Sequence, residues 1–162
     1  MIEKHLQKIL LFSDKFTQEK EYWMAKLAGI SEMAGFPAEN FRLRSDSGPA
    51  KYVFSLPEEI AKKLLAMVNR SETGVFYILL SGVFYLLYRY TGNEDLVVGT
   101  PPFKSKTGIT PSYGLVALRC RIRRGESFRE LLLDLKETVN EAAKNQSLPF
   151  EAIATLLWPS DK

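Results

Sequence analysis

Apolar residues recur along this chain at helical spacing in some stretches and at strand spacing in others. A recurrence every three to four residues predicts helices over residues 1–28, 57–69, 73–90, 128–145 and 149–157. A continuous apolar run predicts a strand covered on both faces over residues 95–100. Residues 51–55 predict a short strand with Tyr52 and Phe54 on one face. Glycine and proline punctuate residues 30–49, which are expected to form a surface loop.

Capping residues mark the starts of two of these helices. Ser55 with Glu58, and Ser127 with Glu130, fit the capping box, in which each side chain bonds the other residue's backbone amide. Pro57 suits the first turn of the earlier helix because it lacks the amide hydrogen that would be unpaired there. Two glycines are expected to end helices, Gly29 and Gly92.

Residues 114–123 alternate in polarity, which predicts a strand with two different faces. Its apolar face comprises Val116, Leu118, Cys120 and Ile122. Its other face, expected to meet solvent or an acidic partner, carries Arg119, Arg121 and Arg123. The helix over residues 73–90 is apolar nearly all round and is therefore expected inside the domain. The order of elements predicts a mixed α/β fold with few strands.

Composition narrows the class of protein. The 162 residues fit one domain, and 46% hydrophobic residues can bury a core. The formal net charge is only +3, with charges mixed along the chain, which argues against nucleic acid as a partner. The apolar run over residues 75–88 has 14 residues, short of the roughly 20 that a bilayer requires, so no membrane partner is expected.

Few side chains suit catalysis. The single histidine, His5, lies in a charged helical context that favours a surface position. The single cysteine, Cys120, lies among apolar neighbours and is expected to be a buried, unreactive thiol. One cysteine forms no disulfide within the chain, which favours a reducing, cytoplasmic location. The sequence has no glycine-rich phosphate loop and no cluster of metal ligands, so no metal site is expected.

The most specific pattern is Asn-Gln-Ser-Leu-Pro-Phe-Glu over residues 145–151. It resembles the (His/Asn)-Gln-Asp-x-Pro-Phe-Glu motif of condensation domains in nonribosomal peptide synthetases, which join two carrier-bound acyl groups through a peptide bond. The motif-equivalent residues are Asn145, Gln146, Pro149, Phe150 and Glu151. A purely structural role is the alternative, with Gln146 bonding backbone and Glu151 in the first turn of a helix.

Other motifs of the same family follow in order. Residues 21–23 resemble its Tyr-Trp helix, 53–59 its strand with Leu-Pro-Glu-Glu, and 87–101 its Arg-Tyr-Thr-Gly-x-Glu-Asp-Leu-Val-Val-Gly-Thr-Pro run. Several separated motifs are more specific than one. The chain departs from the family where Val116 and Ala117 replace Asn and Thr, where Ser147 replaces Asp, and where residues 103–106 replace an Asn-Arg segment. The catalytic His-His-x-x-x-Asp-Gly signature is absent from the sequence.

The resemblance implies the chloramphenicol-acetyltransferase-like fold, in which two similar lobes enclose a tunnel. On this comparison the chain is an incomplete half of such a domain: residues 17–162 are the start of its C-terminal lobe, and residues 1–16 are a helical segment before it. Thr17 is expected to cap the helix that opens the lobe. The 1–16 segment is expected either to dock a partner or to pack on its own domain.

The resemblance therefore implies an N-terminal, partial and catalytically inactive condensation domain of a synthetase that makes a peptide antibiotic, serving as a structural or docking platform within a multienzyme ligase. No cofactor is expected to bind directly, because phosphopantetheine belongs to a carrier-protein partner. Expected partners are neighbouring adenylation and carrier domains or another synthetase subunit. Self-association through the exposed lobe interface is left open. Two alternatives are one half of a split condensation enzyme completed in trans, and a freestanding carrier-protein-binding module.

Overall fold

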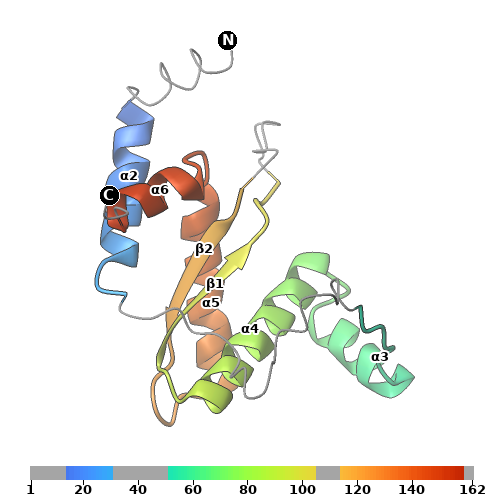
Figure 1. The fold of residues 1–162 in the computed structure, drawn as a ribbon. Helices are drawn as coiled ribbons and strands as arrows, with labels where there is room; N and C mark the ends of the chain where they lie inside the picture. Colours follow the sequence, from blue (N-terminus) through green and yellow to red (C-terminus); the bar gives the residue numbers. More distant parts are fainter. Residues whose placement is uncertain (1–13, 31–50, 105–113, 159–162) are drawn as a thin grey trace.

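The computed structural model describes residues 14–30, 51–104 and 114–158. Figure 1 shows the helices and strands of these residues, which are α2 (Asp14–Leu27), α3 (Glu58–Met67), α4 (Glu72–Thr91), β1 (Asp95–Thr100), β2 (Val116–Arg121), α5 (Phe128–Lys144) and α6 (Phe150–Leu157). His5, the proposed docking segment up to residue 13 and nearly all of the expected 30–49 loop lie outside the described residues. Helix α2 begins at Asp14, so residues 14–16 belong to it, and Thr17 is not its cap.

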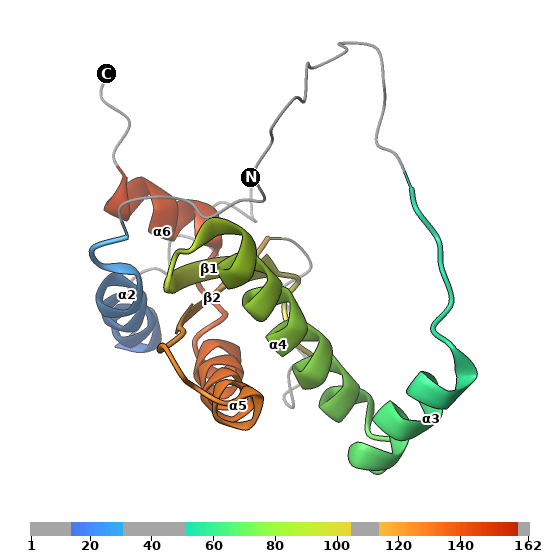
Figure 2. The same ribbon diagram turned by 90° about the horizontal axis from the view of Figure 1, so that it is seen from below.

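The two strands form an antiparallel pair that runs from Asp95 opposite Arg121 to Thr100 opposite Val116. Helix α5 packs on β2 and on α4, α4 also contacts β1, and α2 packs against α6. Figure 2 shows α4 crossing the strand pair, with α2, α5 and α6 grouped together beside it. Two of the three predicted strands and the mixed α/β class are confirmed, although β2 is shorter than expected.

A single cluster of buried side chains joins these elements. It draws on α2, α4, both strands, α5 and α6, and includes Trp23, Phe84, Leu96, Leu118, Leu135 and Ile153. The apolar face of β2 is buried as predicted. In β1, Leu96 and Thr100 are buried, whereas Val97 and Val98 are half-buried and Gly99 is exposed, so this strand is only partly covered.

Helix α5 begins as the sequence predicts. The Ser127 side chain accepts a hydrogen bond from the Glu130 amide at 3.3 Å, and the Glu130 carboxylate accepts one from the Ser127 amide at 2.8 Å. This capping box satisfies two amides that have no partner within the helix. Gly92 ends α4 with φ of 69°, a left-handed conformation that glycine adopts without steric cost. Gly29 follows α2 with φ of 70°.

The prediction that the helix over residues 73–90 lies inside the domain is wrong for the described part of the chain. One side of α4 is buried, through Leu80, Ser81, Phe84 and Leu87. The opposite side is exposed and includes Leu79, Val83 and Leu86. A pattern that is apolar all round indicates that both sides need cover, but it does not say which protein segment supplies it.

Helix α4 also has the length and composition of a membrane span, because it extends beyond the 14-residue apolar run of the sequence. Only 22% of its most apolar stretch is buried. A single such helix is weak evidence for a membrane protein, because core helices of water-soluble domains have the same length and composition.

The strand predicted over residues 51–55 is not formed, since residues 51–57 have no regular secondary structure. The capping box predicted for the next helix is also absent. Helix α3 begins at Glu58 with Pro57 as its cap, so Ser55 lies too far upstream to bond the first turn. Helix α3 buries none of its residues, although the apolar residues of this stretch recur at helical spacing.

Candidate functional site at the α5–α6 junction

The motif run begins where α5 ends. Asn145 caps α5, and its amide donates to the carbonyls of Glu141 and Ala142. Its own carbonyl accepts a 2.6 Å hydrogen bond from the indole nitrogen of Trp23, a buried residue of α2. Asn145 therefore fastens the end of α5 to a helix more than a hundred residues earlier in the chain.

Gln146 clamps the backbone that follows β1. Its side-chain oxygen accepts from the Phe103 amide at 2.7 Å, and its side-chain nitrogen donates to the Phe103 carbonyl at 3.0 Å. The Gln146 side-chain amide therefore satisfies both the backbone N–H and the backbone C=O of Phe103. A paired β-strand satisfies backbone groups in the same way. Gln146 is 9% exposed, so water does not easily replace these bonds.

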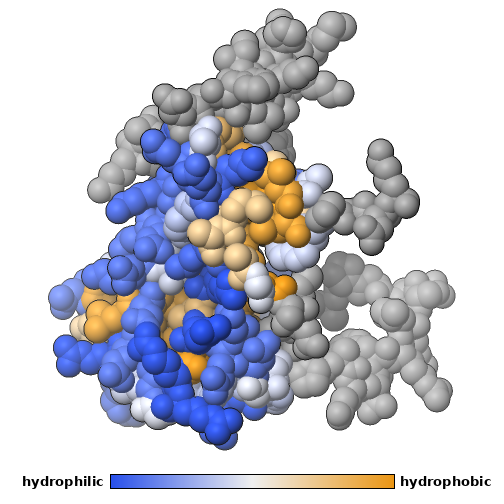
Figure 3. Space-filling model, turned by 90° about the vertical axis from the view of Figure 1, so that its left-hand side faces the viewer, coloured by the Kyte–Doolittle hydropathy of each residue, from blue (hydrophilic) through white to orange (hydrophobic). Residues whose placement is uncertain are grey.

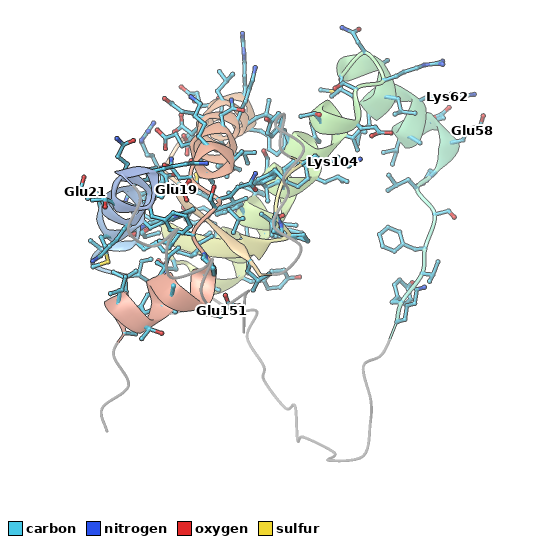
Figure 4. All side chains as sticks on the ribbon, turned by 90° about the horizontal axis from the view of Figure 1, so that it is seen from above. Glu19, Glu21, Glu58, Lys62, Lys104 and Glu151 are labelled. Atoms are coloured by element: carbon cyan, nitrogen blue, oxygen red, sulfur yellow. The ribbon has the colours of Figure 1, made fainter. Side chains whose placement is uncertain are left out.

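Glu19 of α2 is the third brace of this junction. Its carboxylate accepts a 2.8 Å hydrogen bond from the Leu148 amide, and the residue is 2% exposed. Figure 4 shows Glu19 on the side of α2 that faces the rest of the protein and Glu21 on the other side. Lys15 approaches the second carboxylate oxygen of Glu19 to 3.6 Å and donates to the Ser147 hydroxyl at 3.0 Å. The Oε1 atom of Glu19 is buried without a hydrogen-bond partner among the described residues, and Lys15 is its nearby cation.

Pro149, Phe150 and Glu151 open α6. The Pro149 carbonyl accepts from the amides of Ala152 and Ile153, and Phe150 packs against the core. Glu151 is exposed and lies in the first turn of α6, where the helix dipole favours a negative charge. These three residues start and orient the helix.

Histidine is the side chain whose ordinary pKa lies near neutral pH. The described residues contain no histidine. The described part of the chain also holds no group of three or more side chains suited to a metal ion. Burial raises the pKa of Cys120 to about 11, with Asp134 and Glu126 adding to the effect, so its thiol stays protonated and a poor nucleophile. The hydrogen bonds of the junction instead join α2 and the segment after β1 to the end of α5.

An open polar hollow of about 640 Å³ lies between α2, β2 and α5. Arg119 stands at its edge and forks onto Asp95 at 2.6 and 2.8 Å, while donating to the carbonyls of Lys26 and Ala28. The Arg119 hydrogen bond holds the pKa of Asp95 below its usual value, against the opposing effect of burial. Each arginine of this face has an acidic partner within the chain: Asp95 pairs with Arg119 and, at 3.3 Å, with Arg121, and Asp134 pairs with Arg123 at 3.0 Å. Arg121 and Arg123 are nevertheless largely exposed.

The protein face that Figure 3 presents is mostly hydrophilic, with hydrophobic surface limited to patches. Exposed apolar side chains gather elsewhere, on the outer side of α4, on α3 and on residues 51–56. The prediction that an incomplete lobe leaves apolar surface uncovered agrees with this distribution.

Comparisons with known proteins decide the family. The sequence profile of the condensation domain matches residues 4–161, which is nearly the whole chain. The chain belongs to the condensation domain family. One of the linear gramicidin synthase proteins of Brevibacillus parabrevis is 32% identical over 155 residues, covering 91% of this chain and 3% of that protein. Phosphinothricin tripeptide synthetase PhsB of Streptomyces viridochromogenes is 32% identical over 146 residues, covering 86% of this chain and 12% of that protein.

Solved condensation domains share the fold of this chain. The starter condensation domain of rhizomide synthetase RzmA, in a product-released conformation, aligns with a TM-score of 0.73 and 19% identity, covering 99% of this chain and 37% of that one. The first condensation domain of the calcium-dependent antibiotic synthetase aligns with a TM-score of 0.68 and 18% identity, covering 96% of this chain and 35% of that one. The chain is thus part of a chloramphenicol-acetyltransferase-like fold and spans about a third of the length of these domains.

The family resemblance inferred from residues 87–101 and 145–151 is confirmed, and the motif residues occupy one junction. Sequence reasoning missed Glu19 and Phe103 as their partners. Glu19 had a usable signal, because it lies four residues before Trp23 and therefore on the same buried side of α2. Phe103 had no such signal, because Gln146 bonds its backbone, and backbone groups are the same at every residue.

Proposed function

We propose that this chain is a scaffold portion of a condensation domain in a nonribosomal peptide synthetase for peptide antibiotic biosynthesis, and that it is catalytically inactive alone. The observation that carries the proposal is that residues 145–148 bond other segments of the protein. The Asn145 side-chain nitrogen donates to the Glu141 carbonyl, and both polar groups of the Gln146 side chain bond the Phe103 backbone. The buried Glu19 carboxylate accepts from the Leu148 amide. A side chain committed to backbone in this way is not available to a substrate.

The absence of the catalytic signature supports the same proposal. Condensation requires a group that accepts or positions a proton near neutral pH, and histidine is the side chain with that pKa. The sequence has one histidine, His5, and no His-His-x-x-x-Asp-Gly. Two polar family positions on β2 are held by Val116 and Ala117, which are buried and apolar.

The proposed partners follow from the relatives. They are peptide synthetases many times longer than this chain, which covers 3% and 12% of the two compared above. We expect neighbouring adenylation and carrier domains, or another synthetase subunit, to contact this portion in the cytoplasm. The carrier protein brings its phosphopantetheine-bound acyl group as substrate, and this chain contributes a platform for it.

A condensation assay tests the proposal. The chain is mixed with two carrier proteins, each loaded with an aminoacyl group, and dipeptide formation is measured by mass spectrometry against a carrier-only control. We expect no product above that control, while an intact condensation domain run in parallel forms dipeptide. Product from the chain alone that disappears in the His5→Ala variant contradicts the proposal.

One half of a split enzyme is the second candidate, favoured by the uncovered apolar side of α4. On this hypothesis a separate polypeptide supplies the histidine-containing lobe and covers that side. Peptide-bond formation only in the mixture of the two polypeptides, together with their co-purification, supports the split enzyme. Inactivity of the mixture, with the histidine-containing lobe folded, supports the scaffold.

A further inference from the structure

An apolar groove of about 690 Å³ lies between the α3–α4 turn, the first half of α4 and the first half of α5. Figure 2 shows α5 beside α4, with α3 attached at the beginning of α4. Tyr77 of α4 and Leu132 of α5 line the groove. Phe128 and Leu133 of α5 are 47% and 51% exposed in it, and Met67 at its end is 77% exposed. Apolar surface gathered in a concave site indicates a binding surface.

The turn between α3 and α4 gives one end of this groove a defined shape. Asn69 and Arg70 have φ of 49° and 57°, a left-handed conformation that is costly for residues other than glycine. The Arg70 amide donates to the Leu65 carbonyl at 2.8 Å and holds this turn. A side-chain carbon at Gly74 would lie 2.6 Å from the Cβ of Val68, so glycine allows the turn to pack closely on α4. A strained turn of this kind persists only where its surroundings fix it.

The charged residues that line the groove are basic. They are Arg129 and Lys136 of α5, and no Asp or Glu is among the described residues that line it. Both side chains are exposed, and neither takes part in an ion pair within the described part of the chain. By contrast, Arg119 and Arg123 have acidic partners within the protein. The two basic groups of the groove are therefore available to acidic residues of a partner.

The spacing of these residues matches a helix as the bound partner. Arg129 and Lys136 are seven residues apart, which places them on one side of α5, about two turns or roughly 10 Å from each other. A helix lying along α5 presents acidic residues at the same spacing and apolar residues at positions i, i+3 or i+4 and i+7. A flat membrane surface does not enter a groove, so the shape favours a helix over a bilayer.

We propose that this groove binds an amphipathic helix of another protein, whose apolar side fills the groove and whose acidic residues pair with Arg129 and Lys136. Burial of the apolar side supplies the affinity, and the two ion pairs fix the position of the helix along α5. The inference goes beyond the proposed function, because the groove shares no residue with the α5–α6 junction and its binding does not require condensation.

Peptide binding tests the proposal. The probe is a fluorescent amphipathic helical peptide with leucine on one side and glutamate beside it, and a matched peptide carries lysine in place of each glutamate. Fluorescence anisotropy measures the affinity of each peptide for the 162-residue chain. We expect the glutamate peptide to bind at least about tenfold more tightly, and salt to reduce this preference because it screens exposed ion pairs. Equal affinities, or no binding of either peptide, overturn the proposal.

Charge reversal tests the two basic residues. The double variant Arg129→Glu with Lys136→Glu is expected to bind the lysine peptide more tightly than the glutamate peptide, which reverses the preference of the native chain. Lys20→Glu is the control, because it makes the same kind of charge change at an exposed position of α2. The control is expected to keep the native preference. A double variant that still prefers the glutamate peptide contradicts the proposal.

Truncation tests the apolar part of the groove. Leu133→Ala is expected to weaken binding of the glutamate peptide about fivefold, because the leucine loses its contact with the peptide. Leu79→Ala is the matched control, since Leu79 is similarly exposed but lies outside the groove, and its affinity is expected to match that of the native chain. Circular dichroism checks that both variants are folded. Equal weakening in the two variants contradicts binding in the groove.

Two other occupants of the groove give different results. If a second copy fills it, Leu133→Ala shifts the chain towards monomer in sedimentation and neither peptide binds. If an anionic membrane covers it, the native chain sediments with phosphatidylserine vesicles, the double variant does not, and the peptides show no preference. Either result overturns the proposal. None of these measurements uses the dipeptide assay, so the proposed function stands or fails separately.

Discussion

At the scale of single residues, the polar side chains of the motif run join segments that are distant in the sequence. Gln146 reaches 43 residues back to Phe103, and Glu19 reaches 129 residues forward to Leu148. Each contact is buried or partly buried, where an unmade hydrogen bond is expensive. The run stabilises the structure through these few contacts.

Replacing Gln146 by Ala is expected to lower the free energy of unfolding by about 1–3 kcal/mol, because the Phe103 amide and carbonyl lose their partner. Urea unfolding followed by circular dichroism measures the change. Ser147→Ala is the matched control at the next residue, where the lost bond to Lys15 is exposed and worth less than about 0.5 kcal/mol. Equal losses in the two variants contradict the clamp.

The Asp95–Arg119 pair is expected to make stability sensitive to acid. Because the hydrogen bond from Arg119 lowers the pKa of folded Asp95 below 3.8, its contribution is complete above pH 3.8 and is lost as pH falls through the folded value. Asp95→Asn is therefore expected to flatten the fall in urea midpoint below about pH 4. Glu58→Gln is the control, since the Glu58–Lys62 pair is largely exposed. An unchanged pH slope in Asp95→Asn rejects the assignment.

At the scale of elements, α4 is apolar on both sides but buried on only one of them. Its inner side joins the core through Phe84, while its outer side carries exposed Leu79 and Val83. Sequence alone predicts the same burial for both sides because both are apolar. The α5 cap was predictable because Ser127 and Glu130 form their box within four residues of chain, whereas the box predicted for Ser55 and Glu58 is absent.

Truncating the two sides of α4 is expected to have unequal effects. Phe84 is 0% exposed, so Phe84→Ala costs about 3–5 kcal/mol of unfolding free energy. Leu79 lies on the same helix and is 53% exposed, so Leu79→Ala costs less than about 1 kcal/mol. Denaturant titration of both variants at one protein concentration gives the comparison. A large loss for Leu79→Ala means that the outer side of α4 is covered in solution.

At the scale of the whole molecule, the described residues leave much apolar surface uncovered. Two paired strands with helices around them leave α3, residues 51–56 and the outer side of α4 without cover from the described residues. Since this chain spans 37% of a solved condensation domain, we expect the rest of such a domain to supply the cover. Apolar surface of this extent promotes association.

The chain by itself is expected to self-associate through the outer side of α4 as its concentration rises. Analytical ultracentrifugation over a concentration range of about a hundredfold measures the effect. Val83→Lys places a charge on that side and is expected to shift the chain towards monomer, whereas Lys63→Ala on exposed α3 leaves the distribution unchanged. A monomer at every concentration contradicts the expectation.

The sequence by itself determined the helices, the two paired strands, the α5 cap and the family, because these depend on contacts between neighbours or on residue order. Only the tertiary structure decided that residues 51–55 form no strand with the described residues, that Arg119 bonds Asp95 and that Gln146 bonds the Phe103 backbone. The physical reason is distance along the chain. A strand or a buried polar side chain is stable only with a partner, and local pattern does not encode where a remote partner lies.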